Sequence, residues 1–427
     1  MVILNINIMK QIIILFLFVA SITSLSAGDT YTNAVINPGD YDLDSSADPF
    51  VLKDTDGTYY CYVTGAGFPV FSSKDLVNWT YKGKAFPKAR AKWATANFWA
   101  PEVVKLGNYY YLNYTASETA DSPKRIGLAR STSPTGPFDD VNTTPFYNLG
   151  TKGCIDSDIF IDDDGRTYLF YSLALAQNNG VSEIWGIELK PDLSGVIGAA
   201  KQLFVPTLSW ENNVAEAPAM VKHNGLYYLM YSGNGYGNAK YAVGYATSTS
   251  PLGTYTKYSG NPILINGNKG PAITGTGHNA VTTSPDGTEL ICVYHSHINL
   301  AQLGGGPRKV NIDRMGFDAN GNMFISGPTN TPQNYPSSSQ SAIPSTKTEK
   351  SSFFFPNPVK DEITVMISSS KAGNIEICDL SGRIIDSRNF PCNTDKITVP
   401  VSSLNMGMYV ICLKTADCIK KEIFIKV

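Results

Sequence analysis

Three carboxylic acids recur at matching places in the sequence, each at the start of an apolar run. Asp48 opens "DPFVLKDTDGTYYCYVT", Asp156 opens "DSDIFIDDDGRTYLFYS" and Glu216 opens "EAPAMVKHNGLYYLMYSG". Trp99 and His278 open two further runs, "WAPEVVKLGNYYYLNYT" and "HNAVTTSPDGTELICVYH". In every run a Gly or Asn follows the first residue after nine positions, and an aromatic-rich segment comes next.

Two carboxylates that face each other across a pocket suit the hydrolysis of a glycosidic bond. One protonates the leaving oxygen, and the other activates water or attacks the anomeric carbon. A third carboxylate nearby raises the pKa of the acid by like-charge repulsion. Trp99 would supply a stacking face for a sugar ring. Because the sequence has no G-x-S-x-G, Gly-rich phosphate loop or H-E-x-x-H, esterase, nucleotide-binding and zinc-protease chemistry are disfavoured.

The elements that must position these residues are β-hairpins. Each run reads as strand, turn and strand, and third strands follow in "IGLARSTSPTGPF" (126–138) and "VGYATSTSPLGTY" (243–255), with looser copies at 70–79 and 184–195. A β unit of roughly 50–60 residues in tandem is typical of propeller blades. Five units predict an all-β, five-bladed propeller. Since the first strand of each blade lines the axis, the five starting residues should meet there.

The remainder of the chain divides at a polar stretch. Residues 329–350 hold almost no large apolar residue, which predicts a linker. Residues 28–328 then form the propeller, and residues 351–427 show short alternating runs that predict a small C-terminal β-sandwich. Residues 1–27 have the charge, apolar core and small residues of an export signal peptide.

Composition narrows the class of partner. The chain has 427 residues, 43% of them apolar and 16% charged, with a formal net charge of -2. Without a basic patch, nucleic acid is not expected as a partner, and no segment after the signal predicts stable membrane insertion. The seven cysteines lack metal-ligand spacing. Both buried free thiols and one or two C-terminal disulfides remain open.

Taken together, residues 40–328 resemble glycoside hydrolase family 43. The similar segments are "DPFVLKDTDGTYY", "NFWAPEVVKLGNYYYLNY", "IDSDIFIDDDGRTYLFY", "EAPAMVKHNGLYYLMYS", "GTGHNAVTTSPDGTELICVYH" and "IDRMGFDANG", in the order of the family. The resemblance implies an inverting mechanism in which Asp48 is the general base, Glu216 the general acid and Asp156 the residue that tunes Glu216. Inversion implies a separation of ~6.5–9.5 Å between Asp48 and Glu216. Asp158, two residues further on, is the reserve for Asp156.

Further roles follow from the same resemblance or from residue type. His278 matches a position that can contact a central water or metal ion in the family. One interpretation is therefore a structural Ca²⁺ near the propeller axis, and the other is a structural histidine whose hydrogen bonds are made within the protein. No cofactor is expected to be required. Arg308 matches an arginine near the substrate, although a surface position is the alternative. Aromatic residues could form sugar platforms: Phe68, Trp79, Trp93 and Trp210, of which Trp79 fits core packing better. The "DDD" run at 162–164 reads as a solvated turn.

The C-terminal segments "FFFPNPVKDEITVMI", "IEICDLSGRII", "VSSLNMGMYVICL" and "KKEIFIKV" resemble the type A sorting domain of the type IX secretion system. This resemblance implies passage through the periplasm, the type IX machinery as a partner, and a final location at the cell surface or in the medium. A carbohydrate-binding appendage is the alternative for this unit.

The resulting expectation is an exported, inverting glycosidase with a carbohydrate substrate. The family contains enzymes for α-L-arabinofuranosyl and β-D-xylosyl linkages of plant cell-wall polysaccharides. Two alternatives remain. One is a glycosidase of another five-bladed propeller family, although the W-M-N-D-P type start and the R-D-P and E-C pairs are missing. The other is a catalytically silent propeller that binds glycans.

Overall fold

The computed structural model describes residues 30–266, 273–299, 306–338, 354–355, 359–367, 371–379, 383–415 and 419–427. The chain divides into two compact units between residues 344 and 345. The expected signal peptide, residues 1–27, lies outside the described residues.

Five antiparallel sheets of four consecutive strands make up the first unit. Blade 1 contains β2 (Ala47–Lys53), β3 (Tyr59–Thr64), β4 (Pro69–Ser73) and β5 (Thr80–Lys84). Blade 2 contains β6 (Ala96–Leu106), β7 (Tyr109–Ser117), β8 (Arg125–Ser131) and β9 (Asp139–Asp140). Blade 3 contains β10 (Cys154–Ile161), β11 (Thr167–Leu173), β12 (Ile184–Leu189) and β13 (Val196–Phe204).

The last two sheets continue the pattern. Blade 4 contains β14 (Glu216–His223), β15 (Leu226–Gly233), β16 (Ala242–Ser248) and β17 (Thr256–Lys257). Blade 5 contains β18 (Gly277–Thr283), β19 (Leu290–His297), β20 (Arg308–Phe317) and β21 (Met323–Ile325). Four short 3-10 helices occur in the described connections: η1 (Pro38–Tyr41), η2 (Lys88–Arg90), η3 (Leu175–Gln177) and η4 (Ser209–Glu211).

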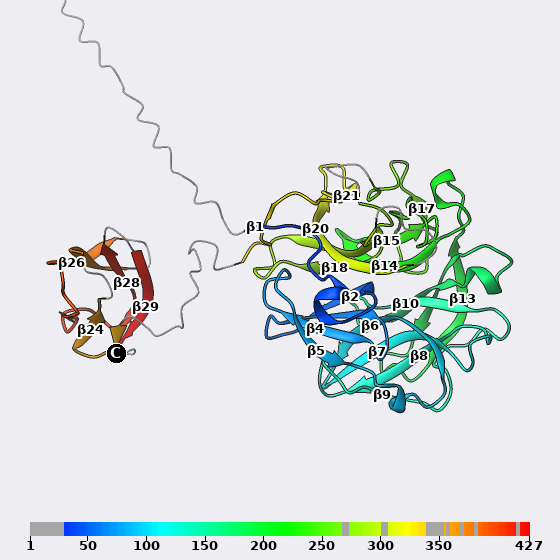
Figure 1. Ribbon diagram of the computed structural model, residues 1–427, viewed down its shortest axis with the longest axis horizontal. Coiled ribbons are helices and arrows are strands. Elements are labelled where there is room, and N and C mark those ends of the chain that lie inside the picture. The colour runs from blue at the N-terminus through cyan, green and yellow to red at the C-terminus, as the bar shows by residue number, and fades with distance from the viewer. Residues whose placement is uncertain are drawn as a thin grey trace, which may run out of the picture. The chain divides into compact units, whose positions relative to one another are not determined.

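The first strands of the five blades surround one axis. In Figure 1 the labels β2, β6, β10, β14 and β18 gather at the middle of the unit, whereas β5, β9, β13, β17 and β21 lie at its rim. β18 packs against β2, so blade 5 closes the ring onto blade 1. The expected five-bladed propeller, including its third strands, is confirmed.

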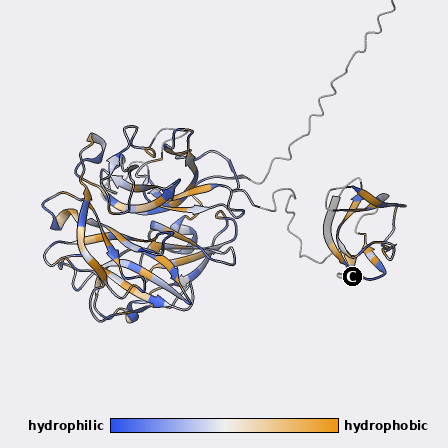
Figure 2. Ribbon diagram, turned by 180° about the vertical axis from the view of Figure 1, so that it is seen from behind, coloured by the Kyte–Doolittle hydropathy of each residue, from blue (hydrophilic) through white to orange (hydrophobic). Residues whose placement is uncertain are grey.

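Apolar side chains fill every junction between neighbouring blades. Val51 packs with Ile312 between blades 1 and 5, and Tyr62 with Leu112 between blades 1 and 2. Corresponding clusters fill the other three junctions. Figure 2 shows the apolar colouring concentrated along strands and the hydrophilic colouring along many of the loops. Because each blade buries apolar residues on both faces, no blade forms a separate core, and the ring is stable as a whole.

Hydrogen bonds link an aspartate in the first turn of one blade to a lysine and a tyrosine of the next blade, and we call each such group a blade latch. Asp162, in the turn after β10, accepts hydrogen bonds from Lys222 Nζ and from the hydroxyl of Tyr227, both in blade 4, each at 2.5 Å. Asp54 does the same for Lys105 and Tyr110 of blade 2. The expectation of a wholly solvated "DDD" turn is therefore wrong for Asp162, which is buried.

The expected start of the linker at residue 329 is also wrong. β22 (Gln333–Asn334) pairs with β1 (Thr30–Tyr31), and buried Thr329 donates its backbone N–H and its hydroxyl to the carboxylate of Asp313. Asn33 Nδ2 donates to the carbonyl oxygens of Ile312 and Thr329. The segment through residue 338 thus belongs to the propeller unit, because it and the N-terminal segment together cover blade 5.

The second unit contains two sheets around one apolar core. One sheet has the order β23 (Phe354–Phe355), β24 (Glu362–Met366), β27 (Lys396–Pro400). The other has the order β26 (Ile384–Phe390), β25 (Gly373–Cys378), β28 (Gly407–Thr415), β29 (Ile419–Lys426). Both sheets contribute buried residues to the same cluster, including Ile363, Ile377 and Phe424. The expected small β-sandwich is confirmed.

Cys61, Cys154 and Cys292 are buried thiols in the propeller, and burial raises the pKa of each. Cys418 lies outside the described residues. Across the described part of the chain, no helix has the length and apolar character needed to cross a membrane.

Candidate active site

A β-bulge interrupts the first strand of every blade near its start. One residue of each bulge has a left-handed backbone, with φ between 46° and 53°: Asp48, Ala100, Asp156, Ala217 and His278. A non-glycine residue in this region is uncommon and marks a backbone held by its surroundings. The bulge turns the strand so that two adjacent side chains are displayed at the same end of the axis.

The left-handed residue is held by a hydrogen bond that repeats around the ring. Its backbone N–H donates to a side chain on the second strand of the preceding blade. The acceptors for blades 2 to 5 are hydroxyls: Thr64, Thr115, Ser172 and Ser232, at 2.7–3.1 Å. At the seam between blades 5 and 1 the acceptor is Nδ1 of His295, 3.1 Å from the N of Asp48.

This pattern corrects the expectation that all five candidate residues share one position. Asp48, Asp156 and His278 occupy the left-handed position, whereas Trp99 and Glu216 precede it by one residue. The reason lies in the hairpins. The loop between the first and second strands has two residues in blades 2 and 4, after Leu106 and His223, but five residues in blade 1. Counting nine residues back from the turn residue therefore reaches Trp99 and Glu216 in blades 2 and 4, one residue before the left-handed positions Ala100 and Ala217.

Asp48 lies beside one arginine and two histidines. Its Oδ1 accepts from Arg308 Nη1 at 2.8 Å and lies 3.3 Å from Nδ1 of both His278 and His295. Burial opposes ionisation of this carboxyl, but the guanidinium of Arg308 holds the pKa of Asp48 well below its usual range. Asp48 is thus a carboxylate across the ordinary pH range.

Glu216 has the opposite character. Burial raises the pKa of its carboxyl to about 7, against a hydrogen bond of 2.8 Å from the hydroxyl of Tyr241 to Oε1, and the negative charge of Asp48 adds to the increase. Burial and the charge of Glu216 likewise raise the pKa of Asp156 well above its usual range. Two interacting carboxyls with this little access to water cannot both ionise near neutrality, so this pair retains a proton.

The structure therefore brings together an ionised carboxylate and a protonated carboxyl around one end of the axis. A carboxylate can take a proton from water, and a carboxyl with a pKa near 7 can donate one to a leaving oxygen. Asp158 does not join this group. It accepts from the backbone N–H of Met220 and contacts Glu102, so Asp156 is the better match for the third acid.

The other predicted residues divide between the site and the core. Trp99 is 38% exposed at the blade 2 position, with Lys124 Nζ 5.3 Å from its ring centre. Phe68 was expected to contact substrate, but this is wrong: it is 0% exposed and packs against Phe86 and Tyr114. Trp79 is buried, as expected for a core residue.

Trp93 and Trp210, two further candidates for sugar platforms, are only partly buried but pack against core rings. Trp93 stacks on Tyr114, and Trp210 lies against Tyr231, with ring centres 6.1 and 5.6 Å apart. Their faces are therefore engaged within blades 2 and 4, which leaves Trp99 as the exposed indole of the group.

The fit of a metal ion at His278 can be tested on the residues present. Its Nδ1 faces Asp48, and its backbone N–H is bound to Ser232. Within the described ranges no group of three or more His, Cys, Asp or Glu residues is arranged to hold a metal. Ca²⁺ prefers six to eight oxygen ligands, which this position does not offer, so no catalytic step is assigned to a metal.

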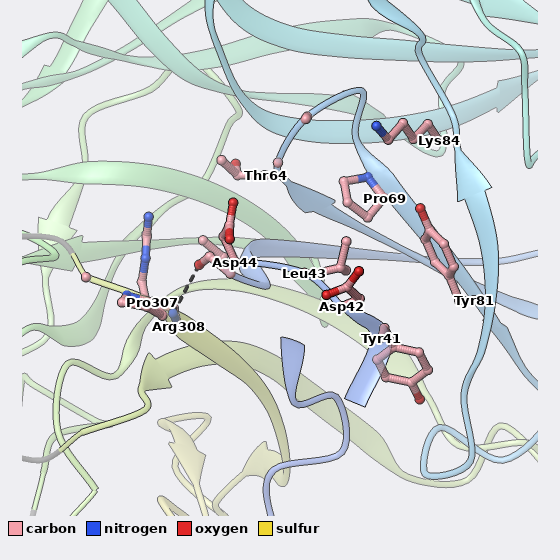
Figure 3. Close-up of a pocket in the computed structure, with 15 residues that line it drawn as sticks. Tyr41, Asp42, Leu43, Asp44, Thr64, Pro69, Tyr81, Lys84, Pro307 and Arg308 are labelled. Atoms are coloured by element: carbon pink, nitrogen blue, oxygen red, sulfur yellow. Dashed lines mark hydrogen bonds between the residues drawn. The ribbon is translucent and has the colours of Figure 1, made fainter. Parts of the chain in front are cut away.

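A cavity of about 720 Å³ lies over blade 1, and its lining includes Arg308 and Ala47, which are the partner and the chain neighbour of Asp48. Its walls combine polar and apolar surface, with Asp44, Thr64, Lys84 and Arg308 among the lining residues and Tyr81 at the far side. Figure 3 shows Arg308 at one end of this cavity and Lys84 with Tyr81 at the other. The volume lies within the range of roughly 300–1,000 Å³ found for small-molecule sites.

Several residues of the site escaped the sequence analysis. His295 and Tyr241 touch the base and the acid, and Tyr236 places its exposed ring 4.7 Å from the guanidinium carbon of Arg308. A signal for His295 existed. The second strands of blades 1 to 4 carry Thr or Ser where blade 5 has His295, in the segments "CYVT", "NYT", "FYS", "MYS" and "VYHSH". Tyr241 lies in a connection, where no periodic pattern points to it.

A closed five-bladed propeller with this pair of carboxyls on its axis defines a glycoside hydrolase. Comparison with known proteins agrees. Residues 37–323 match Glycosyl hydrolases family 43, and the chain belongs to this family. Residues 353–426 match the secretion system C-terminal sorting domain, so the protein is exported to the cell surface or the medium through the type IX system.

Individual relatives support the assignment. The chain is 33% identical to the beta-D-galactofuranosidase xynD of Aspergillus niger, over 60% of this chain and 73% of that protein. It is 33% identical to the arabinoxylan arabinofuranohydrolase of Bacillus subtilis, over 44% of this chain and 40% of that protein. A crystal structure of a thermostable family-43 glycoside hydrolase aligns with a TM-score of 0.67 and 42% identity, covering 72% of this chain and all of that one.

Proposed function

We propose that this protein is an inverting exported glycosidase that cleaves α-L-arabinofuranosyl or β-D-xylosyl linkages of plant cell-wall polysaccharides or their oligosaccharides. In this mechanism Asp48 takes a proton from water as the water attacks the anomeric carbon. Glu216 donates its proton to the departing oxygen, and Asp156 supports the protonated state of Glu216. The separation of ~6.5–9.5 Å between the two carboxyls stays a prediction of the inverting mechanism.

One observation carries the proposal, namely the opposite protonation of two carboxyls in one buried site. Arg308 keeps Asp48 ionised, while burial keeps Glu216 protonated up to a pKa of about 7. A general base and a general acid therefore coexist in mildly acidic to neutral solution without a further reagent. A protein that only bound glycans would gain nothing from this arrangement.

The surroundings of the two acids support a sugar substrate. Trp99 offers an exposed indole face on the axis side of blade 2, and aromatic faces are suited to the apolar surfaces of sugar rings. The cavity over blade 1, which shares Arg308 with the site, offers room for a neighbouring part of the substrate.

The two named relatives act on furanosides according to their names, one on galactofuranosides and one on arabinoxylan. This favours the α-L-arabinofuranosyl linkage over the β-D-xylosyl linkage as the first substrate to test. Because the arabinoxylan relative aligns over only 40% of its length, the similarity concerns the catalytic unit and does not extend to the polymer that the relative attacks.

The test is sugar release by the full chain from 4-nitrophenyl α-L-arabinofuranoside, 4-nitrophenyl β-D-xyloside and linear arabinan. Glu216→Gln should lose at least about 100-fold in kcat, while Glu188→Gln, at a surface ion pair with Arg166, serves as the matched control. Proton NMR of the first-formed sugar should show the inverted anomer. Release of the retained anomer would contradict the assignment of Asp48 as a base.

The same experiment separates the alternatives. Products from arabinan alone would indicate attack within chains, whereas release from one aryl glycoside would indicate removal of terminal sugars. The binding-only alternative predicts a folded protein that releases no sugar from any of the three substrates. That protein would still be slowed by arabinoxylan in an affinity gel, both as the parent and as Glu216→Gln.

A further inference from the structure

Two fully buried side chains lie between the base and the acid and have no role in the mechanism given above. His295 is on β19 of blade 5, and Tyr241 is in the connection before β16 of blade 4. Both are 0% exposed, so neither can touch a sugar. Their rings stack on each other with centres 5.6 Å apart and an interplanar angle of 13°.

His295 contacts the base through one nitrogen. Nδ1 accepts the backbone N–H of Asp48 at 3.1 Å, which requires an unprotonated Nδ1. Burial lowers the pKa of His295 to about 3, so the ring is neutral and carries its proton on Nε2. The other four blades make the corresponding bond with a small hydroxyl side chain. Since a hydroxyl is sufficient to hold this backbone in four blades, the imidazole ring at the seam can make a further contact.

Tyr241 contacts the acid, and its ring is held on two sides. Its hydroxyl donates to Oε1 of Glu216 at 2.8 Å. The imidazole of His295 covers one part of the ring, and the backbone of Gly277 lies so close that a Cβ there would come within 2.1 Å of a ring carbon. Only glycine at position 277 leaves room for the tyrosine ring. Thr276 Oγ1 also donates to the carbonyl of Tyr241.

We propose that His295 and Tyr241 act as one positioning unit, which fixes the general acid relative to the general base by ring stacking and sets the charge state of Glu216 through the tyrosine hydroxyl. The unit runs from the backbone of Asp48 through the imidazole and the phenol ring to Oε1 of Glu216. This inference rests on the proposed function for its kinetic consequences, but its contacts can be tested without a substrate.

Other ionisable groups around Glu216 bear on the same carboxyl. The charged or titratable residues that act on it from the packed elements are Asp48 of β2, Asp156 of β10 and Arg308 of β20. Asp48 and Arg308 have opposing effects on the pKa of Glu216, and the hydrogen bond from Tyr241 lowers it. Tyr241 is therefore the neutral member of this group whose removal leaves every formal charge in place.

Tyr241→Phe removes the hydroxyl but keeps the stacked ring. Loss of a hydrogen bond to a charged group destabilises the carboxylate, so the alkaline limb of kcat/KM should move to higher pH by about one unit. Tyr245→Phe is the matched control, since Tyr245 is a buried tyrosine of the same blade whose hydroxyl accepts the backbone N–H of Met323. An alkaline limb that stays within 0.2 unit (about the error of the profile) in Tyr241→Phe overturns the role of the hydroxyl.

A direct titration makes this result independent of activity. The carboxyl carbon of Glu216 can be followed by NMR in protein labelled with ¹³C-glutamate, with Glu216→Gln for assignment. The midpoint should rise in Tyr241→Phe and stay unchanged in Tyr245→Phe. If the parent protein hydrolyses no glycoside, the proposed function fails while this titration still decides the inference. If the parent is active and the midpoint does not move, the inference alone fails.

His295→Thr installs the side chain type that the other blades use, so the bond to the N–H of Asp48 is retained while the stack on Tyr241 is lost. We expect kcat to fall about 10-fold with KM changed less than threefold. If the rings act as one unit, Tyr241→Phe should have a much smaller effect in the His295→Thr background than in the parent. Independent, multiplicative effects of the two substitutions would overturn the proposal.

Discussion

The charge of Asp48 depends on one arginine, and replacing it gives a quantitative prediction. Arg308 Nη1 is 2.8 Å from Oδ1 of Asp48, with both side chains nearly buried. Arg308→Met keeps much of the side-chain length and removes this hydrogen bond and its charge. Because the guanidinium lowers the pKa of Asp48, its loss should raise that pKa, while the two histidines remain.

The size of the effect follows from the kind of bond. A hydrogen bond to a charged group contributes about 1.5–3 kcal/mol, and one pKa unit corresponds to about 1.4 kcal/mol. The acidic limb of kcat/KM should therefore move up by about 1–2 pH units. The sign is fixed, since a base with a lowered pKa is active above that pKa and loses activity as the pH falls through it. The alkaline limb, which belongs to Glu216, should move much less.

The assay is a pH profile of kcat/KM on the best aryl glycoside, with circular dichroism at each pH to confirm that the protein is folded. Arg314→Met is the control, because Arg314 lies on the same strand β20 but pairs with Glu289, away from Asp48. An acidic limb that is identical in parent and Arg308→Met would refute the argument that Arg308 keeps the base ionised. A shift of equal size in Arg314→Met would show that the effect is not local.

Three further predictions concern the platform, the blade latch and metal dependence. Trp99→Ala should raise KM about 2–10-fold with little change in melting temperature, whereas Phe68→Ala should cost about 3–5 kcal/mol of stability; a stable Phe68→Ala protein with a raised KM would reverse these roles. Asp162→Asn should lower the melting temperature by about 2–4 °C at pH 7, because Lys222, Tyr227 and the N–H of Asp163 lower the pKa of the Asp162 carboxyl against its burial. This difference in melting temperature should vanish as the pH falls through the lowered pKa. A difference that persists at such a pH would contradict the role of Asp162 in linking blades 3 and 4. Activity should stay within about twofold after treatment with EDTA, because side chains perform both proton transfers; a loss restored by Ca²⁺ would show a metal requirement.

The blades were predictable because period and turn residues are local features of the sequence. Hairpins with aromatic second strands recur at a regular spacing, and the axis position of their first strands follows from the architecture alone. The exact offset of Glu216 was not predictable, because it depends on whether a hairpin turns in two residues or five. That choice becomes visible only when the pairing of His223 with Leu226 is known.

Contacts between distant residues limited the rest of the site prediction. Phe68 was proposed as a sugar platform from its residue type alone, yet its ring completes the core between blades 1 and 2. Arg308 was expected near the substrate only through family resemblance, and its bond to Asp48 joins residues 260 positions apart. Tyr241 carries no pattern at all. Side chains in connections take their roles from packing, which a period in one sequence does not encode.

The seam of the ring has a consequence for when the molecule can work. Asp48 belongs to the first blade, but the groups that keep it ionised come from the last one, and the bond from its N–H to His295 spans 247 positions. Contacts this distant in sequence form late in folding. A chain that is still being synthesised, or one cut before blade 5, holds its general base without these partners. We therefore expect hydrolysis to begin only when blade 5 has closed the ring onto blade 1, so that only complete molecules are active.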